Sequence, residues 1–511
     1  MATIVQFQVA PEQAKDDSFL RFKIQKEVKT DNFTFKWKKR SVDARNRNIK
    51  INCTFNVFLD GEVPEEMAVF VPNKELKGEI GIVGFGPAGI FAALRAIELG
   101  IKPIVFERGK DVRSRRRDLA ILNKESIVNE ESNYCFGEGG AGTYSDGKLY
   151  TRSKKRGDVQ RALEWFVHFG ANEDIAVDAH PHIGTNKLPQ IIEDMREAIL
   201  ANGGEVHFGS KVTNLFSENH KMTGLEINGS QRFDFDNVIL ATGHSARDIF
   251  DIIHANEWKL YPKPFALGVR IEHPQELIDK IQYSGRVNDD FIPPASYSLV
   301  SQVEGRGVYS FCMCPGGIIA PCATSPGEVV TNGWSPSKRN NPFANSGIVV
   351  SVSPEDFDNS TDPFVCLDFQ KDVEKKCWEA GGKTQQVPAQ RLEDFMNDRI
   401  SESLPKTSYQ PGIHSVDLND VLPPLITKSL KVAFKEFGKK MNGFMTNDAV
   451  IHAPESRTSS PVQIPRGKDL QHPDVAGLFP CAEGAGYAGG IISAAIDGMR
   501  CVDVIMEGKA I

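Results

Sequence analysis

Apolar residues over residues 77–255 follow two alternating patterns. Short apolar runs such as 80–83 predict buried strands, whereas 87–99 and 188–200 carry apolar residues at the three- and four-residue spacing of a helix. Because strand and helix alternate, this region is expected to form a parallel α/β sheet. The same pattern returns over residues 446–511, where a short strand, a glycine-rich turn and a helix follow one another.

Two other regions have different patterns of apolar and polar residues. Residues 19–28 and 51–59 predict strands of a small N-terminal α+β domain. Further along, short strands, proline-rich turns and one or two helices predict a mixed β-rich domain. Since the α/β pattern resumes after it, we expect this domain to be inserted into the α/β domain. The expected domains are 1–76, 77–255, 256–445 and 446–511.

Composition and charge narrow the class of protein. The 511 residues suffice for two or three domains, and 40% hydrophobic with 25% charged residues is ordinary for a soluble globular chain. A net charge of −7 gives no general attraction to nucleic acid or anionic membranes. The nine cysteines are scattered and odd in number, which argues against a disulfide framework and favours the cytoplasm. We see neither a signal peptide nor a membrane span.

A glycine-rich turn follows the first predicted strand of the α/β region. Gly84, Gly86 and Gly89 form a G-x-G-x-x-G motif, a helix follows it, and the next strand ends at Glu107. Such glycines allow a tight turn, approach to a pyrophosphate and close helix–strand contact. The helix N-terminus attracts phosphate, and the carboxylate suits ribose hydroxyls. The sequence therefore predicts a dinucleotide site for FAD or NAD rather than NADP.

Other segments favour FAD. The glycine motif recurs at 137–142 and 484–489, but neither copy lies in a complete βαβ unit, so no second nucleotide domain is expected. The strand and ATG turn at 238–243 are typical of the chain's exit from an FAD domain. The helix beginning at Ile491 is expected to point its positive end at the flavin. It is also consistent with a helix that merely follows a glycine turn.

The stretch 135–149 is either a mobile surface loop or, as we expect, a segment whose bare backbone lies against the flavin ring. With the motifs above it completes the predicted cofactor site. The predicted cofactor-binding residues are Gly84, Gly86, Pro87, Ala88, Gly89, Glu107, Arg108, Arg116, Gly139, Gly140, Ala141, Gly142, Val212, Ala241, Thr242, Gly243, Glu483, Gly484, Gly489, Gly490 and Ile491.

Nearly the whole chain resembles the uncharacterised bacterial FAD-dependent dehydrogenases. The segments that carry the resemblance are FGEGGAGTYSDGKL, ATGHSARD, CMCPGG, VTNGWS, AEGAGYAGGI and Asp43-Ala44-Arg45 in the small N-terminal domain. The resemblance implies an α/β fold with a glutathione-reductase-like Rossmann FAD domain and a substrate domain. It names no substrate, so the reaction has to be inferred from the residues themselves.

Candidate catalytic residues are His244, Cys314 and Lys148. His244 follows the ATG turn, and histidine is the natural acid or base near neutral pH. Cys312 and Cys314 would share one face of a strand, with Cys322 nearby. Close neighbours along a strand are poorly placed for a disulfide, so the sequence favours a packing or substrate-loop role over a redox role. The sequence shows no spacing that is typical of metal ligands, so no metal site is expected.

We therefore expect an FAD-dependent oxidoreductase of dehydrogenase type. Hydride would pass through a non-covalent FAD to or from a small-molecule substrate in the cleft between the FAD domain and the inserted domain. NAD(P)H, if used, would visit transiently. Arg457 and Arg466 either hold an anionic substrate or lie at the surface.

Two alternatives remain open from the sequence. The first is a flavoprotein that binds or modifies RNA through the basic segment 33–50, where Phe35 and Trp37 could stack on bases. The second is a binding module with a structural FAD. The net charge argues against a nucleic-acid partner, and no membrane partner is expected. The sequence does not determine the oligomeric state.

Overall fold

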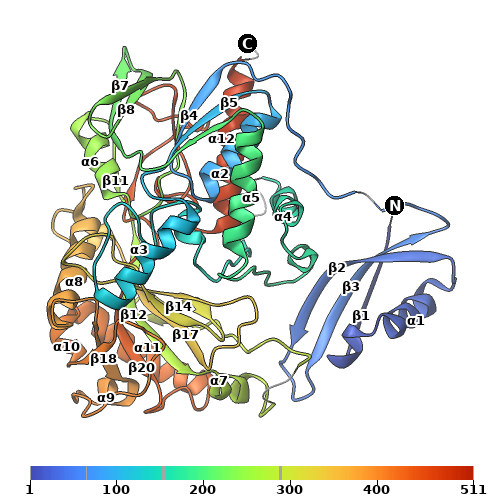
Figure 1. Cartoon of the computed structure of the whole chain (residues 1–511). Helices are drawn as coiled ribbons and strands as arrows, with labels where there is room; N and C mark the ends of the chain where they lie inside the picture. Colours follow the sequence, from blue (N-terminus) through green and yellow to red (C-terminus); the bar gives the residue numbers. More distant parts are fainter. Residues whose placement is uncertain (1, 65, 152–156, 287–289, 510–511) are drawn as a thin grey trace.

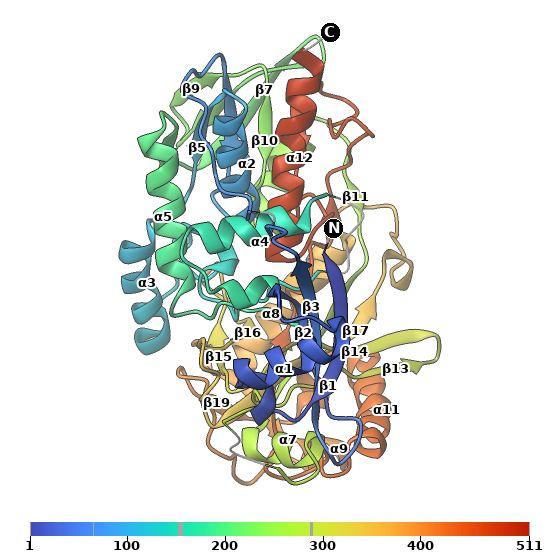
Figure 2. The ribbon, with the colours of Figure 1, turned by 90° about the vertical axis from the view of Figure 1, so that its right-hand side faces the viewer.

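The computed structural model describes residues 2–64, 66–151, 157–286 and 290–509. Figure 1 shows a mixed α/β protein with three parts: an α/β unit, a second unit below it, and a small N-terminal unit to one side. A quarter turn brings the N-terminal unit in front of the lower unit (Figure 2). Within the described residues, no helix combines the length and apolarity needed to cross a membrane.

The N-terminal unit is a three-stranded antiparallel sheet in the order β1-β3-β2, with one helix beside it. Its elements are β1 (Thr3–Val9), η1 (Glu12–Lys15), α1 (Asp17–Val28), β2 (Phe33–Asp43) and β3 (Lys50–Leu59).

The predicted strand over residues 19–28 is wrong, because this segment lies in the helix α1. Leu20 and Ile24 are fully buried, and their four-residue spacing places them on one face of a helix. Phe22 lies between them in the sequence and is 50% exposed. Asp16 caps the helix by accepting a hydrogen bond from the Phe19 N–H at 3.0 Å.

The basic segment contributes the edge strand β2. Phe35 and Trp37 do not stand free, because their rings lie 5.4 and 4.2 Å from the ring of Phe55. Arg40 joins this unit to the α/β unit through ion pairs with Asp174 at 3.3 Å and Asp178 at 2.8 Å.

The α/β unit is built on a five-stranded parallel sheet in the order β22-β10-β4-β5-β6. Its elements are β4 (Glu79–Val83), α2 (Pro87–Glu98), β5 (Lys102–Phe106), α3 (Val112–Glu125), η2 (Gly140–Gly142), α4 (Val159–His168), η3 (Glu173–Ala176), α5 (Leu188–Ala201), β6 (Glu205–His207), β7 (Val212–Glu218), β8 (Lys221–Ile227), β9 (Gln231–Asp234), β10 (Val238–Leu240), α6 (Arg247–Ala255), β22 (Leu478–Pro480) and α12 (Ile491–Lys509).

The two faces of this sheet have different covers. Ile82 and Ile239 belong to a core shared with α2, α5 and α12, which lie side by side in Figure 1. Val83 and Leu240, the next residues along their strands, belong to a core shared with the antiparallel sheet β7-β8-β9. Successive strand residues point to opposite faces, so a strand buried on both sides is apolar throughout. This explains the continuous apolar runs in the sequence.

The second unit contains a seven-stranded mixed sheet in the order β13-β14-β17-β12-β20-β18-β19. Its elements are β12 (Phe265–Pro274), α7 (Gln275–Gln282), β13 (Val300–Val303), β14 (Arg306–Cys314), β15 (Ile318–Pro321), β16 (Thr331–Trp334), β17 (Phe343–Val352), η4 (Pro354–Asp356), α8 (Val365–Ala380), β18 (Val387–Arg391), α9 (Leu392–Met396), β19 (Ile413–Ser415), α10 (Leu418–Val421), α11 (Pro424–Lys440) and β20 (Val450–Glu455). Between the units, β11 (Tyr261–Pro262) pairs with β21 (Val462–Gln463).

Two expectations for this unit need correction. It contains the helices α7 to α11 rather than one or two helices, because apolar residues of α8 and α11 such as Val373 and Phe434 cover the sheet. The chain also returns to the α/β unit later than residue 446. The strand β20 pairs with β12 and β18, so it belongs to the inserted sheet.

Candidate functional site

A cavity lies at the carboxyl ends of the parallel strands. The segments that follow β4, β5, β10 and β22 all line it, and Phe311, Cys312 and Asn332 of the second unit face them. Ligands of open α/β sheets bind at this edge, where the loops after the strands converge. The cavity therefore has one wall from each unit.

Most of the predicted residues line this one cavity. The predicted cofactor-binding residues that do so are Gly84, Gly86, Pro87, Ala88, Glu107, Arg108, Gly140, Ala141, Gly142, Val212, Ala241, Thr242, Gly243, Glu483, Gly489, Gly490 and Ile491. His244 and Lys148, two of the candidate catalytic residues, line it as well.

The structure places the other predicted residues outside the lining. A Cβ on Gly89 would lie 2.0 Å from the Gly84 carbonyl oxygen, so this glycine brings α2 close to the turn after β4. A Cβ on Gly139 or Gly484 would also overlap neighbouring protein atoms. Cys314 is fully buried and does not line the cavity, although Cys312 does. Arg116 is exposed on α3 and does not reach the cavity. The buried arginine of this helix is its neighbour Arg115.

Two buried side chains hold the loop 135–149 in place. Glu107 accepts hydrogen bonds from the N–H groups of Phe85 at 2.9 Å, Gly109 at 2.8 Å and Gly137 at 2.9 Å. Arg115 donates to the carbonyl oxygens of Asn133 at 2.7 Å and Glu138 at 2.9 Å. A carboxylate has about four acceptor positions, so Glu107 keeps about one for a ligand while it fixes the loop.

The N-terminus of α2 is open toward the cavity. Gly86 is the N-cap and no side chain caps the helix. A Cβ on Gly86 would meet only the Gly140 Cα, at 3.9 Å. The first N–H groups of the helix therefore face a space that a phosphate can enter, and the helix dipole favours its charge.

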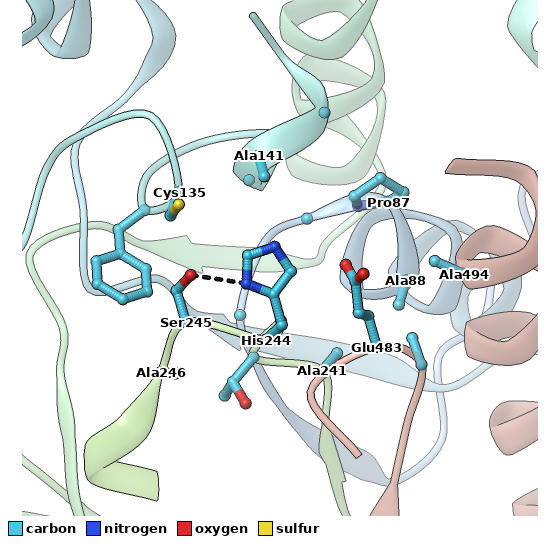
Figure 3. Close-up of a pocket in the computed structure, with 18 of the residues that line it drawn as sticks. Pro87, Ala88, Cys135, Ala141, Ala241, His244, Ser245, Ala246, Glu483 and Ala494 are labelled. Atoms are coloured by element: carbon cyan, nitrogen blue, oxygen red, sulfur yellow. Dashed lines mark hydrogen bonds between the residues drawn. The ribbon is translucent and has the colours of Figure 1, made fainter. Parts of the chain in front are cut away.

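Two titratable side chains line the same part of the cavity. Figure 3 shows the imidazole of His244 and the carboxyl of Glu483 pointing into the same space. His244 pairs through Nδ1 with the Ser245 hydroxyl at 2.7 Å. Burial, with Arg457 and Arg247 nearby, lowers the pKa of His244 to about 3. Burial raises the pKa of Glu483 to about 8 although Lys263 opposes the shift. Both groups are therefore uncharged at neutral pH.

Behind His244 lies a buried ionic cluster that sequence patterns did not reveal. Arg457 pairs with Glu374 at 3.1 Å and also with Glu328, and it donates to the Thr324 hydroxyl at 2.7 Å. Arg247 pairs with the same two carboxylates at 2.7 and 2.9 Å. The partners are far apart in sequence, and no local motif marks them.

The two arginines singled out from the sequence have different places. Arg457 lines the cavity from this buried cluster and does not lie at the surface. Arg466 pairs with Asp497 at 2.8 Å and donates to the Pro480 carbonyl at 2.8 Å, so it ties α12 to β22. Among the described residues, no group of three or more His, Cys, Asp or Glu side chains is arranged to hold a metal ion.

Comparison with known proteins places the chain in a family. It is 40% identical over 490 residues to an uncharacterised protein of Clostridium beijerinckii, an alignment that covers 92% of this chain and 91% of the relative. Residues 264–458 match the family model described as FAD-dependent protein, C-terminal domain-like, and residues 1–58 match a domain of unknown function. The chain belongs to the same family as the clostridial protein.

More distant similarities are partial. An FAD-dependent monooxygenase of Hypoxylon pulicicidum is 26% identical over 202 residues, which cover 35% of this chain and 40% of the relative. Among solved structures, a geranylgeranyl bacteriochlorophyll reductase-like protein of Thermoplasma acidophilum is 14% identical, with a TM-score of 0.35 over 85% of this chain and 79% of that chain. Glycine oxidase of Bacillus cereus is 13% identical, with a TM-score of 0.31 over 85% and 96%. We draw no functional conclusion from these structures.

Proposed function

We propose that the protein is an FAD-dependent oxidoreductase. One observation carries the proposal: the open N-terminus of α2, Glu107, the ATG turn, residues 140–142 and the start of α12 all line one cavity at the carboxyl ends of the sheet. The family model matched by residues 264–458 supports the cofactor. The described residues fit such a ligand, since the wall is glycine-rich where it must approach a flat ring and a pyrophosphate.

Each part of the wall has a role toward the cofactor. The N–H groups at the start of α2 would hold the pyrophosphate, and Glu107 would accept a ribose hydroxyl. Gly140 and Gly142 line the cavity, where their bare backbone would allow the ring to approach closely. The start of α12 would stabilise negative charge on the ring. Bound FAD supplies hydride transfer between its ring and a substrate.

We further propose the finer class. The cofactor is held without a covalent bond in a glutathione-reductase-like domain, and the enzyme is a cytoplasmic dehydrogenase that acts on a small molecule. NAD(P)H, if it is the donor, visits transiently. This class is supported by the single complete βαβ glycine motif that follows β4.

The substrate is expected beside His244. A smaller pocket shares His244 and Arg457 with the main cavity and adds the rings of Tyr134, Tyr144 and Trp334. His244 is uncharged there and accepts or donates a hydrogen bond without a net charge. Aromatic walls with a few polar groups are typical of small-molecule sites.

The test is an absorbance spectrum of the FAD-loaded protein before and after anaerobic addition of NADH or NADPH. Bleaching of the flavin by one of them supports the proposal and identifies the donor. Bleaching only by a third compound, found by screening small organic reductants, supports a dehydrogenase that takes electrons from its substrate. A flavin that dithionite reduces but that no donor reduces would contradict a catalytic role.

A further inference from the structure

The strand β14 carries an irregularity at the cavity. Phe311 pairs with Gly347 and Cys314 with Asn345, so three steps along β14 match two along β17. This is a β-bulge with one extra residue. Cys312 lies in it with a φ of 47°, a left-handed conformation that is uncommon for residues other than glycine. Such conformations gather at functional sites. The expectation that Cys312 and Cys314 share one face assumed a regular strand, so it does not hold across the bulge.

The bulge brings both thiols to one ammonium group. The Lys148 Nζ lies 3.8 Å from the Cys312 Sγ and 3.7 Å from the Cys314 Sγ. The Cys314 thiol also donates a hydrogen bond to the Cys312 backbone carbonyl oxygen at 3.2 Å. Cys312 lines the cavity, whereas Cys314 is fully buried behind it. One thiol is therefore open to a ligand, and the other lies within reach of the first.

The charges around the pair favour one thiolate. The neighbouring Cys314 side chain lowers the pKa of Cys312 well below the ordinary thiol value, against the effect of burial and with the help of Lys148 and Arg270. The same contact and burial raise the pKa of Cys314. A thiolate beside a second, protonated thiol is the usual state of a reduced catalytic dithiol.

Other charged groups face the pair from several elements. Arg270 of β12 is neutralised by Glu455 of β20 at 2.8 Å. Asp146 pairs with Arg339 at 2.8 Å and lies 3.6 Å from the Lys148 Nζ. Across the cavity, negative charge on Cys312 helps to raise the pKa of Glu483, so this carboxyl adds no charge beside the pair at neutral pH. Arg270 is paired with Glu455, and Asp146 is paired with Arg339. Lys148 is therefore the cation that contacts both sulfurs.

We propose that Cys312 and Cys314 form a redox-active dithiol that exchanges an electron pair with the FAD in the cavity. The inference rests on the proposed function for its partner. The Cys312 thiolate and the Cys314 thiol give up two electrons and the Cys314 proton, and an S–S bond forms. FAD takes up the electron pair and that proton. In the reverse direction, reduced FAD returns both and the S–S bond breaks. The pair stores electrons next to the flavin.

A second thiol pair in the chain provides a matched control. Cys501 lies close enough to Cys481 to raise its pKa, and both side chains are fully buried. Neither lines the cavity. Substitution of Cys481 should therefore leave electron exchange with the flavin unchanged.

The deciding experiment is an anaerobic dithionite titration of the FAD-loaded, fully oxidised protein, with peptide mapping of disulfides before and after. We expect twice the electron uptake of FAD alone and a Cys312–Cys314 disulfide only in the oxidised sample. Cys312→Ser and Cys314→Ser should each reduce uptake to that of FAD, whereas Cys481→Ser should keep the native value. Native uptake equal to that of FAD alone, with both thiols free after oxidation, would overturn the proposal.

Alkylation separates this inference from the proposed function, because it needs no flavin. Without FAD, iodoacetamide should modify Cys312 of the reduced protein well below the pH at which free thiols react. Lys148→Met should slow this reaction roughly tenfold, because the Cys312 thiolate loses a cation beside it. Lys371→Met, at a half-exposed lysine outside the cavity lining, should have no effect. An unchanged rate in Lys148→Met would show that Lys148 does not stabilise the Cys312 thiolate. A protein that cannot bind FAD but still shows fast alkylation of Cys312 would contradict the proposed cofactor and support the thiolate.

Discussion

The two walls of the cavity consist of different kinds of residues. The wall from the α/β unit consists largely of glycine, alanine and helix N-termini, as in Gly86 and Gly142. The opposite side is backed by buried ions, where Arg457 pairs with Glu328 and Glu374, and Arg270 with Glu455. Bare backbone accepts a ligand by shape and N–H groups, whereas buried ions fix side chains and set their protonation.

This difference separates binding from chemistry. A change in the backbone wall should alter ligand affinity and spare the fold. A change in the ionic wall should alter the fold or the protonation of groups that face the ligand. The predictions below test that separation, first in the ionic wall, then in the backbone wall and last through the pH dependence of stability.

The largest effect is expected in the ionic wall. Arg457→Met leaves Glu328 and Glu374 with less compensation in a buried site, which should lower the free energy of unfolding by about 3–5 kcal/mol. Chemical denaturation measures this change. Arg399→Met is the control, because the Arg399 side chain is 62% exposed and should contribute within about 0.5 kcal/mol. Equal losses in the two variants would contradict the role of the cluster.

A smaller effect, confined to binding, is expected in the backbone wall. Gly86 has a φ of −79° that valine can adopt, and its Cβ would meet nothing closer than 3.9 Å. Gly86→Val should therefore fold normally but weaken FAD binding by about 10- to 100-fold, the equivalent of roughly 1–3 kcal/mol of overpacking against the ligand. Flavin fluorescence quenching measures the affinity.

The control for this variant is Gly508→Ala, where an added Cβ meets no atom within 4 Å and lies near the end of α12, outside the cavity lining. It should bind FAD as tightly as the native protein. If Gly86→Val bound FAD with native affinity, the ligand would have to lie elsewhere in the cavity.

The third prediction concerns the dependence of stability on pH. The Glu483 carboxyl has a pKa raised from 4.5 to about 8 in the folded protein. Its contribution to stability is therefore complete below the unfolded value and is lost as the pH rises through the folded value. In the protein without FAD, Glu483→Gln should gain stability relative to the native protein as the pH rises from 4.5 toward 8.

Thermal unfolding at several pH values measures this gain. The exposed Glu218→Gln should not change the pH curve of the native protein. Parallel curves for Glu483→Gln and the native protein would show that Glu483 does not stay protonated in the cavity.

The backbone wall could be predicted because its signals are local. Gly84, Gly86 and Gly89 lie within six residues, and each follows from the turn, the ligand or the helix. Glu107 also follows at a fixed distance. The pattern did not reveal that three N–H groups hold its oxygens, since Gly137 comes from a later segment.

The ionic wall could not be predicted, because its partners meet only in the fold. Arg457 and Glu328 are 129 residues apart, and Arg270 and Glu455 are 185 apart. The helix α1 was missed because Leu20, Phe22 and Ile24 alternate like a strand, although the fold buries only two of them. The Cys312 bulge depends on pairing with β17, which no single segment shows.

The most direct test of the central claim is the cofactor content of the purified protein. After denaturation and filtration, the account predicts FAD in the filtrate, released without a covalent bond and in about equimolar amount to the chain. A purified protein that contains no flavin, and takes up none after incubation with FAD, would contradict the account.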